Sequence, residues 1–444
     1  MNPTDQINFL YDVFARSSGV TTDSRKINDG SIFFALKGER FDGNRFALKA
    51  IEQGAILAVV SDPNLAENDN CFLVEDTLVT LQQLARHHRR QFDIPFLAIT
   101  GSNGKTTTKE LTYAVLSKAY QTYATRGNLN NHIGVPLTLL DIGADAELAI
   151  VEMGANHVGE IGFLCSIAEP EYGLITNVGK AHLEGFGGIK GVIKGKGEMF
   201  RYLEANKGTA FVNLLQPHLS DMARGVEKII GFGTTESQPY IVNLTDSYPF
   251  LSLEWCYNLE GKQEIQNIQT SLYGKYNFHN ILAAIAVGWY FKVPPIDIKS
   301  AIEAYVPANN RSQIAKHGTN VFYLDAYNAN PVSMRLALET FGALEETNKV
   351  TILGDMKELG HESTAEHQAI IDLLNELTDS KFPISNTILV GEEFYQLSYF
   401  VSEKLKFYRD TGALKDWFSK QKFTDTHFLI KGSRSIGLER LLDE

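Results

Sequence analysis

The chain has 444 residues, of which 44% are hydrophobic and 21% are charged, and its 41 basic and 53 acidic side chains give a formal net charge of −12. This composition excludes gross disorder, and the length predicts two to four domains. The acidic balance argues against a general nucleic-acid-binding protein. The acidic balance does not exclude the binding of small anionic ligands, because local loops can hold them.

Cysteine usage and the N-terminal sequence bear on location. The three cysteines form no CxxC pair, and such a sparse, odd set is typical of a reducing compartment. No signal peptide is visible, and no apolar run approaches the roughly 20 residues of a membrane span. We therefore expect a cytoplasmic protein without a membrane span and without a nucleic-acid partner.

Residues 1–90 predict a small α/β domain. Short apolar, β-prone runs begin at Ser31, Ile56 and Cys71, and apolar residues at helical spacing follow the first and third of them. The last helix ends in the basic run His87–Arg90. A solvated helix C-terminus is the favoured interpretation of this run, and a nucleic-acid patch is the alternative.

Residues 91–307 predict a second domain with a mostly parallel sheet. Its strands begin at Phe96, Leu148 and Tyr172, with helical stretches between them. Near the end of this domain, strand alternation on both sides of Glu260–Lys262 predicts an antiparallel hairpin.

Residues 308–444 predict a third domain. Apolar strands are predicted from Val350, Thr387 and His427, and each ends in a glycine plus a polar residue. Helical patterns separate these strands. This arrangement is Rossmann-like, with sites expected at the carboxyl ends of the strands.

The strongest chemical signal is AITGSNGKTTTKEL, from Ala98 to Leu111. A strand leads into a glycine-rich turn and then a helix, which is how backbone N–H groups and a helix N-terminus hold phosphate. Lys105 would contact the β- and γ-phosphates and Thr106 would contact Mg²⁺. The predicted ATP-binding residues here are Gly101, Ser102, Asn103, Gly104, Lys105, Thr106 and Thr107. A glycine-rich turn with a solvated lysine is the alternative.

Polar side chains follow two further strands of the same predicted sheet. Glu152 ends one strand, where a carboxylate can meet the Mg²⁺ of a nucleotide, and His182 follows the next. A carboxylate and a histidine in water are the alternatives. Spacing alone does not distinguish Lys194 from Lys196 as a functional lysine.

Taken together, the motifs resemble the Mur ligases. TGSNGKTTT, VEMGAN, NVGKAHLEGFGG, KGKGEMF, YGKYNFHN, DAYNANPVSM, LGDMKELG and LIKGSRS occur in this order. The opening segment TDSRKINDGSIFFALKGERFDGNRF is similar to the uridine-nucleotide domain of that family, so the resemblance runs from about Thr22 to Leu441. NANP stands where relatives that add a diamino acid have DNPR, and this favours the dipeptide-adding branch.

The resemblance implies an α/β protein with a small N-terminal uridine-nucleotide domain, a central phosphate-loop ATPase domain and a C-terminal Rossmann-like domain that receives the dipeptide. It implies an ATP-dependent, ADP-forming ligase of peptidoglycan synthesis. ATP would phosphorylate the carboxylate of UDP-N-acetylmuramoyl-tripeptide, and the amine of D-alanyl-D-alanine would attack the acyl phosphate to give a tetrahedral intermediate. We expect two Mg²⁺ ions and a monomer.

The resemblance also assigns roles residue by residue. Lys105, Glu152, His182 and Lys196 match catalytic positions, and Lys196 is expected to be carbamylated and to hold metal together with Thr106, Glu152 and His182. Asn277, Asn280, Arg311 and Asp325 match ATP-contacting positions. A helix N-cap for Asn277 and a solvated interdomain side chain for Arg311 are the alternatives. The expected substrate-binding residues are Ser24, Arg25, Lys37, Asp42, Asn128, Asn130, Asn131, Tyr327, Asn328, Asn330, Lys431, Ser433 and Arg434.

Three other functions compete with this interpretation. They are another Mur-type amino-acid ligase, a ligase like folylpolyglutamate synthase, and a phosphate-loop NTPase that acts as a switch. The TDSRKI segment argues against the folate type. No residue is assigned as the base for the dipeptide amine, because His182 and a carbamate on Lys196 would both be engaged with metal.

Overall fold

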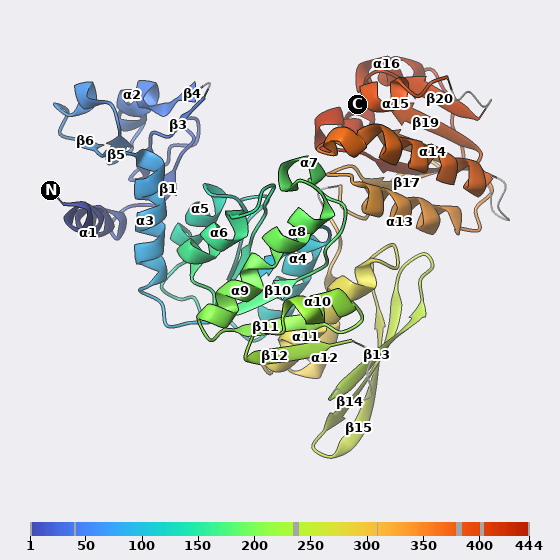
Figure 1. Cartoon of the computed structure of the whole chain (residues 1–444), viewed down its shortest axis with the longest axis horizontal. Coiled ribbons are helices and arrows are strands. Elements are labelled where there is room, and N and C mark those ends of the chain that lie inside the picture. The colour runs from blue at the N-terminus through green and yellow to red at the C-terminus, as the bar shows by residue number, and fades with distance from the viewer. Residues whose placement is uncertain are drawn as a thin grey trace.

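In the computed structural model the chain forms an N-terminal, a central and a C-terminal α/β unit, with the central unit lying between the other two (Figure 1). The structure describes residues 2–39, 41–233, 239–308, 310–378, 384–399 and 404–442. In these ranges every helix is too short or too polar to cross a bilayer. The predicted boundaries near residues 91 and 308 fall between elements, and as domain limits they stay predictions.

The N-terminal unit is built on a parallel sheet of strand order β1-β2-β5-β6. The three strands predicted from the apolar runs are present as β2, β5 and β6. The strands are β1 (Val20–Thr21), β2 (Ile32–Phe34), β5 (Leu57–Val60) and β6 (Cys71–Leu73), with a small ladder of β3 (Lys37–Gly38) and β4 (Phe41–Asp42). The helices are α1 (Pro3–Phe14), α2 (Ala47–Glu52) and α3 (Thr77–Arg89), with short 3₁₀ turns η1 (Gly43–Phe46) and η2 (Pro63–Leu65).

Helix α3 joins the N-terminal unit to the central one. It begins at the cap Asp76, whose side chain accepts from two backbone N–H groups, and it ends in the basic run. The run is a helix C-terminus as favoured, but it is not simply solvated. His88 and Arg89 are buried, and Arg89 donates to the carbonyl oxygens of Ala168 and Glu169 over 2.9 and 2.8 Å. Arg89 therefore makes an interdomain contact rather than facing solvent.

The central unit has a six-stranded, fully parallel sheet of order β12-β11-β10-β7-β9-β8. Its inner strands β7 and β9 are buried along their whole length and apolar except for their last residues, Thr100 and Glu152, as expected when helices cover both faces. The strands are β7 (Phe96–Thr100), β8 (Thr122–Ala124), β9 (Leu148–Glu152), β10 (Tyr172–Ile175), β11 (Thr209–Asn213) and β12 (Lys228–Phe232). The helices are α4 (Lys105–Leu116), α5 (Gly134–Leu140), α6 (Glu160–Ala168), α7 (Leu183–Phe186), α8 (Ile189–Lys196), α9 (Glu198–Ala205), α10 (Pro217–Met222), α11 (Asn277–Tyr290) and α12 (Pro295–Ala304).

A separate antiparallel sheet of β13 (Tyr240–Asp246), β14 (Ser252–Leu259) and β15 (Lys262–Gln269) projects from the central unit (Figure 1). The turn between β14 and β15 lies at Glu260–Gly261, which confirms the predicted hairpin. Alternate residues of β14 are buried, with Trp255 fully so, because only one face of this sheet packs against the core.

The C-terminal unit has a six-stranded sheet of order β16-β17-β21-β18-β19-β20, in which only β16 runs antiparallel to its neighbour. This confirms the Rossmann-like prediction. The strands are β16 (Gln313–His317), β17 (Asn320–Asp325), β18 (Lys349–Gly354), β19 (Asn386–Val390), β20 (Leu405–Tyr408) and β21 (His427–Lys431). The helices are α13 (Pro331–Gly342), α14 (Ser363–Thr378), α15 (Glu392–Tyr395) and α16 (Thr411–Phe418), with 3₁₀ turns η3 (Gly360–Glu362), η4 (Arg434–Ile436) and η5 (Leu438–Leu441).

Candidate active site

A cavity of about 680 Å³ lies where the central and C-terminal units meet. Its central-unit walls are the segment after β7, the end of β9, the segment after β10 and the start of α11. The C-terminal unit closes it with the segment after β17 and with Lys431 at the end of β21. Parallel strands therefore present their carboxyl ends to one shared space, as the sheet topology requires.

The phosphate loop, residues 101–104, is tightly packed between β7 and α4. Gly101 and Gly104 have φ of 147° and 78°. A Cβ on Gly101 would approach Thr176 Oγ1 to 1.9 Å, and one on Gly104 would approach Asn280 Oδ1 to 2.5 Å. Both positions require glycine, for conformation and for space. The loop and the N-terminus of α4 line the cavity, as predicted for a phosphate site.

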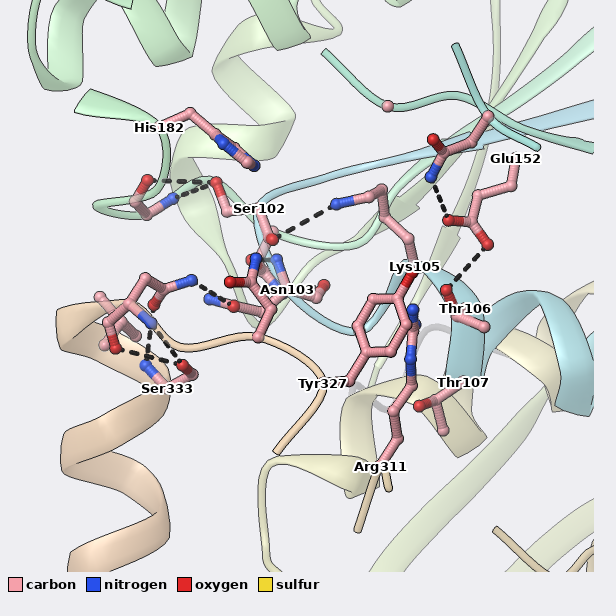
Figure 2. A pocket seen from close by; sticks show the side chains of 18 of the residues that line it. Ser102, Asn103, Lys105, Thr106, Thr107, Glu152, His182, Arg311, Tyr327 and Ser333 are labelled. Atoms are coloured by element: carbon pink, nitrogen blue, oxygen red, sulfur yellow. Dashed lines mark hydrogen bonds between the residues drawn. The ribbon is translucent and has the colours of Figure 1, made fainter. Parts of the chain in front are cut away.

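Lys105 is held within its own loop. Its Nζ donates to the carbonyl oxygen of Gly101 over 2.7 Å, and Figure 2 shows the side chain lying between the loop and Glu152. Burial lowers the pKa of Lys105 from its ordinary value, and Glu152 partly offsets this. Backbone carbonyl oxygens accept hydrogen bonds from this ammonium group but carry no full negative charge. An anionic ligand in the cavity would supply that charge.

Glu152 is the buried carboxylate of the cavity, at 1% exposure. Its Oε2 accepts from Thr106 Oγ1 over 2.9 Å, and its Oε1 accepts from Asn130 Nδ2 over 2.8 Å. Its own backbone N–H donates to Thr125 Oγ1 over 2.9 Å. Asn130 thus contacts the carboxylate, although it was expected to face the muramoyl peptide. A hydroxyl beside a carboxylate is an oxygen donor pair that suits Mg²⁺.

A second lysine of the phosphate-loop motif, Lys109, is buried near the Glu152 carboxylate. Lys109 is 3% exposed, and its Nζ donates to the carbonyl oxygen of Thr125 over 2.8 Å. Burial lowers the pKa of Lys109, and the nearby Glu152 and Glu110 raise it. The motif KTTTKE contained this residue, but sequence reasoning gave it no role.

Asn277 and Asn280, at the start of α11, form a buried amide chain with the phosphate-loop helix. Asn280 Nδ2 donates to Asn277 Oδ1 over 2.8 Å, and Thr108 Oγ1 donates to Asn280 Oδ1 over 3.1 Å. Asn277 Nδ2 donates to the carbonyl oxygen of Tyr273 over 2.7 Å. The helix has no side-chain N-cap bond, so the capping alternative for Asn277 is wrong. Both residues line the cavity.

Arg311 stacks on an aromatic ring of the C-terminal unit. Its guanidinium carbon lies 3.6 Å from the ring centroid of Tyr327, and that of Arg434 lies 5.0 Å from the same centroid. Figure 2 shows the Arg311 and Tyr327 side chains face to face in the cavity. Arg311 is therefore not a simply solvated side chain, because its plane is held by a cation–π contact.

Two further contacts fix the C-terminal wall. Lys431 Nζ donates to Asp325 Oδ2 over 2.5 Å and to the carbonyl oxygen of Asn328 over 3.2 Å. Asn330 caps α13 and also donates its amide to Asn103 Oδ1, over 2.7 Å. The last contact joins the phosphate loop directly to the segment expected to face the dipeptide.

His182 and Lys196 are the two remaining residues that were predicted to hold metal. His182, which lines the cavity, pairs through Nδ1 with Glu358 of the C-terminal unit, and this hydrogen bond holds the pKa of Glu358 below its ordinary value. Lys196 is 1% exposed, and its Nζ donates over 3.2 Å to the carbonyl oxygen of Ala155, which lines the cavity. Burial, reinforced by Lys105, lowers the pKa of Lys196 well below its ordinary value.

The chain is similar to known proteins over almost its whole length. Residues 99–288 match the Mur ligase middle domain, 310–398 the family described as Mur ligase, glutamate ligase domain, and 16–89 the family described as Mur ligase family, catalytic domain. The UDP-N-acetylmuramoyl-tripeptide--D-alanyl-D-alanine ligase of Bacillus subtilis is 33% identical over 96% of this chain and 92% of its own. The chain belongs to the Mur ligase family.

Relatives and solved structures agree with this membership. The Escherichia coli ligase of the same name is 34% identical over 95% of this chain and 92% of its own. The MurF structure of Acinetobacter baumannii is 30% identical, with a TM-score of 0.82 over 99% of this chain and 97% of that chain. The MurF ligase of Thermotoga maritima, in complex with ADP, is 26% identical with a TM-score of 0.80, covering 97% of each chain. A folylpolyglutamate synthase shares the fold at 14% identity.

The structure of this Mur ligase brings most of the predicted site together. The following predicted residues line the cavity: Ser102, Asn103, Gly104, Lys105, Thr106, Thr107, Asn128, Asn130, Asn131, Glu152, His182, Asn277, Asn280, Arg311, Asp325, Tyr327, Asn328, Asn330 and Lys431. Gly101, Lys196, Ser433 and Arg434 adjoin it without being part of its lining. Ser24, Arg25, Lys37 and Asp42 lie in the N-terminal unit, outside this cavity, and their role toward the uridine nucleotide stays a prediction.

The predicted metal residues do not form one cluster. Thr106 and Glu152 are bonded to each other, whereas His182 is paired with Glu358 and Lys196 with a backbone carbonyl. Among the residues that the structure describes, no group of three or more His, Cys, Asp or Glu side chains is gathered as metal ligands. This arrangement fits an ion that arrives with nucleotide, because Mg²⁺ in such sites takes one or two carboxylates and completes its shell with phosphate and water.

Sequence reasoning missed two polar residues that organise the site. Asn177 accepts from the Asn103 backbone N–H over 3.0 Å and donates to its carbonyl oxygen over 2.9 Å, so it fixes the phosphate loop from β10. Glu358 reaches His182 from another domain. Asn177 is the first residue of the motif NVGKAHLEGFGG, and Glu358 lies in LGDMKELG. The local sequence pattern does not predict the hydrogen-bond partner of either residue.

Proposed function

We propose that this Mur ligase joins D-alanyl-D-alanine to UDP-N-acetylmuramoyl-tripeptide with ATP, forming ADP, in peptidoglycan precursor synthesis. The curated relatives that cover more than nine tenths of both chains carry this activity in their names. The observation that supports it in the structure is one cavity that joins the phosphate loop and the Thr106–Glu152 pair to the C-terminal segment around Tyr327 and Asn330. A ligase of this kind needs ATP, the carboxylate substrate and the amine substrate in one such space.

The first step joins two anions. A carboxylate oxygen of the tripeptide attacks the γ-phosphorus of ATP, and ADP leaves. The negative charge is met by Lys105 and by Arg311, which lies against Tyr327 in the same cavity. Backbone N–H groups of the phosphate loop add further donors.

We propose that Thr106 and Glu152 hold Mg²⁺ at the nucleotide and that His182 and Lys196 contribute to a second site. The bound ion would neutralise phosphate charge and orient the reacting oxygens. The donor set fits at Thr106 and Glu152, which already share a hydrogen bond of 2.9 Å in a buried setting. It fits at His182 because the ring lines the cavity with one nitrogen engaged by a carboxylate.

Carbamylation of Lys196 is proposed on the state of its amine. CO₂ bonds only to a neutral amine, and the reaction releases one proton as the carbamate forms. Burial lowers the pKa of Lys196 well below its ordinary value, so a larger fraction of this amine is neutral than in an exposed lysine at the same pH. A carbamate would turn a buried cation into an anionic oxygen donor beside Lys105, whose positive charge now opposes that of Lys196.

In the second step the amine of D-alanyl-D-alanine attacks the acyl carbon, and the tetrahedral intermediate expels phosphate to leave the amide. The C-terminal wall, with Asn328, Asn330 and the Lys431–Asp325 pair, is where we place the dipeptide. Asn330 bonds Asn103 of the phosphate loop, so the dipeptide segment and the nucleotide segment are set relative to each other. The cytoplasmic location and the monomeric state stay predictions.

The proposal is tested by varying the acceptor. The protein is incubated with ATP, Mg²⁺ and UDP-N-acetylmuramoyl-tripeptide, with either D-alanyl-D-alanine or single amino acids, and the products are identified by mass. Amide formation only with the dipeptide supports the proposal. Product with a single amino acid alone would favour another Mur-type ligase, and phosphate release that depends on neither substrate would favour an NTPase switch.

A further inference from the structure

The loop after β10 and the loop after β18 meet across the interface of the central and C-terminal units. His182 Nδ1 pairs with the carboxylate of Glu358, and the backbone N–H of Glu184 donates to the carbonyl oxygen of Glu358 over 3.2 Å. Lys180 forms an ion pair with Glu366 close by. In Figure 1 the short helix α7, which starts after His182, points toward the C-terminal unit.

Both partners of the central contact have an uncommon backbone conformation. His182 has φ of 53° and Glu358 has φ of 64°, in the left-handed region that costs a residue with a Cβ energy. Gly360, with φ of 56°, brings the second loop so near that a Cβ there would lie 3.2 Å from Cβ of Glu184. Such strain is retained where the surrounding structure over-determines it, and it clusters at functional sites. Two residues with left-handed backbone conformations thus face each other across the interface of the two units.

The chemistry of the pair determines which nitrogen of His182 carries the proton. An ionised carboxylate can only accept hydrogen bonds, so Nδ1 of His182 must carry the proton that it donates to Glu358. In the neutral ring the lone pair is then on Nε2. The imidazole lines the cavity with 19% of its side-chain surface exposed. Among the residues that the structure describes, Nε2 has no hydrogen-bond partner and can accept a ligand. A carboxylate on the second nitrogen is the usual support of a histidine that binds metal.

We propose that Glu358 is a positioning residue through which docking of the C-terminal unit completes the metal site of the central unit. The carboxylate fixes the Nδ1–H tautomer and the ring orientation of His182, so His182 becomes a competent ligand only when the loop after β18 is seated. The inference rests on the proposed function, which gives His182 its role toward Mg²⁺. It adds a reason why nucleotide, metal and acceptor domain must assemble together.

Glu358→Ala and Glu358→Gln test the inference, with Glu366→Ala as the matched control. Glu366 belongs to the same interface and pairs with Lys180 rather than His182. The dependence of ligation on Mg²⁺ and the binding of Mn²⁺ to the protein–ADP complex, followed by electron paramagnetic resonance, are measured for each. Glu358→Ala is expected to weaken metal binding by about ten- to a hundredfold, the usual effect of losing such a support. Glu358→Gln keeps an acceptor oxygen and should show a smaller loss, and Glu366→Ala should match the parent protein.

A second readout follows the tautomer itself. With ¹⁵N-labelled histidine, the ring signals of His182 are assigned by their loss in His182→Gln. The parent protein should show the Nδ1–H tautomer, and Glu358→Ala should shift the ring toward the other tautomer or a mixture. An altered fold alone would move the unfolding midpoint without this selective change. Unchanged Mn²⁺ affinity and an unchanged tautomer in Glu358→Ala, or in Glu358→Gln where the alanine variant does not fold, would overturn the inference.

The outcome also separates this inference from the proposed function. If His182→Gln weakens Mn²⁺ binding while both Glu358 variants do not, the metal role of His182 stands and the positioning role of Glu358 fails. If His182→Gln itself binds Mn²⁺ like the parent protein, the proposed metal role of His182 is wrong. The positioning role of Glu358 is then wrong as well.

Discussion

Asn130 Nδ2 donates a hydrogen bond of 2.8 Å to Oε1 of Glu152, from a loop that crosses the carboxyl ends of β8 and β9. The backbone N–H of Gly154 also donates to the carbonyl oxygen of Asn130 in this loop, over 2.7 Å. A Cβ on Gly154 would lie 2.9 Å from Asn130 Oδ1, so the contact leaves no room for a side chain there. The segment expected to face the muramoyl peptide is thus fastened to the carboxylate expected to hold metal.

Asn130→Ala should therefore affect both stability and metal dependence. Loss of the amide leaves a carboxylate oxygen that is buried without its partner, which costs about 1–3 kcal/mol of unfolding free energy. The Mg²⁺ concentration for half-maximal ligation should also rise, because the carboxylate loses its fixed orientation. Denaturant unfolding and a Mg²⁺ titration check the two effects. A variant with unchanged values in both would show that the contact has no role.

Thr106→Val removes the hydroxyl from Glu152 while keeping the shape of the side chain. The hydrogen bond of 2.9 Å is lost, and with it a donor oxygen for the metal. We expect ATP-dependent ligation to fall by about ten- to a hundredfold, with ADP binding in EDTA nearly unchanged. Thr106→Ser restores the hydroxyl and should restore most of the rate. Equal activity of the valine and serine variants would contradict the metal role of this hydroxyl.

Lys196 gives a prediction for the pH dependence of stability in CO₂-free buffer. Its pKa is lowered in the folded protein, so between the folded and unfolded pKa values the unfolded chain binds more protons. The free energy of unfolding should then rise as pH increases through this window toward about 10.4, the ordinary lysine value. Lys196→Met removes the titrating group. Its unfolding free energy should exceed that of the parent protein at pH 7, and the difference should shrink as pH rises.

The same residue predicts a dependence of activity on CO₂. Protein depleted of CO₂ should lose ligation and regain it when bicarbonate is added, whereas Lys196→Met should be inactive in both conditions. Lys194→Met is the control, because Lys194 lies two residues away on α8 and has an ordinary exposed setting. Full activity of the parent protein after removal of CO₂ would contradict the proposed carbamylation of Lys196.

Much of this arrangement could be predicted from sequence, because it depends on neighbours along the chain. The glycine-rich turn between β7 and α4, the β14–β15 hairpin and three strands in each of the three larger parallel or mostly parallel sheets follow from local pattern. The strands predicted in this way are β2, β5 and β6, then β7, β9 and β10, and then β18, β19 and β21. Long-range pairs could not be predicted in this way. Glu358 and His182 lie 176 positions apart, and their contact depends on how two domains pack. The burial of Arg89 depends likewise on the carbonyl groups that the end of α6 presents to α3.

Arg89 gives a stability prediction with a matched control on the same helix. Arg89→Ala should lower the free energy of unfolding by about 2 kcal/mol or more, because it leaves one buried and one part-buried carbonyl oxygen without their charged donor. Arg86→Ala removes an exposed partner of Glu169 and should change it by less than about 1 kcal/mol. Urea unfolding of the two variants decides this, and similar losses would show that α3 is not anchored through Arg89.

The acyl phosphate route is tested most directly by isotope transfer. UDP-N-acetylmuramoyl-tripeptide carrying ¹⁸O in both oxygens of its terminal carboxylate is converted with ATP and D-alanyl-D-alanine, and the released phosphate is analysed by mass. Attack of the carboxylate on the γ-phosphorus predicts one ¹⁸O atom in each phosphate and one in the new amide, with phosphate release dependent on the tripeptide. Phosphate without ¹⁸O would mean that water attacks ATP, and it would contradict the assignment of this site to amide ligation.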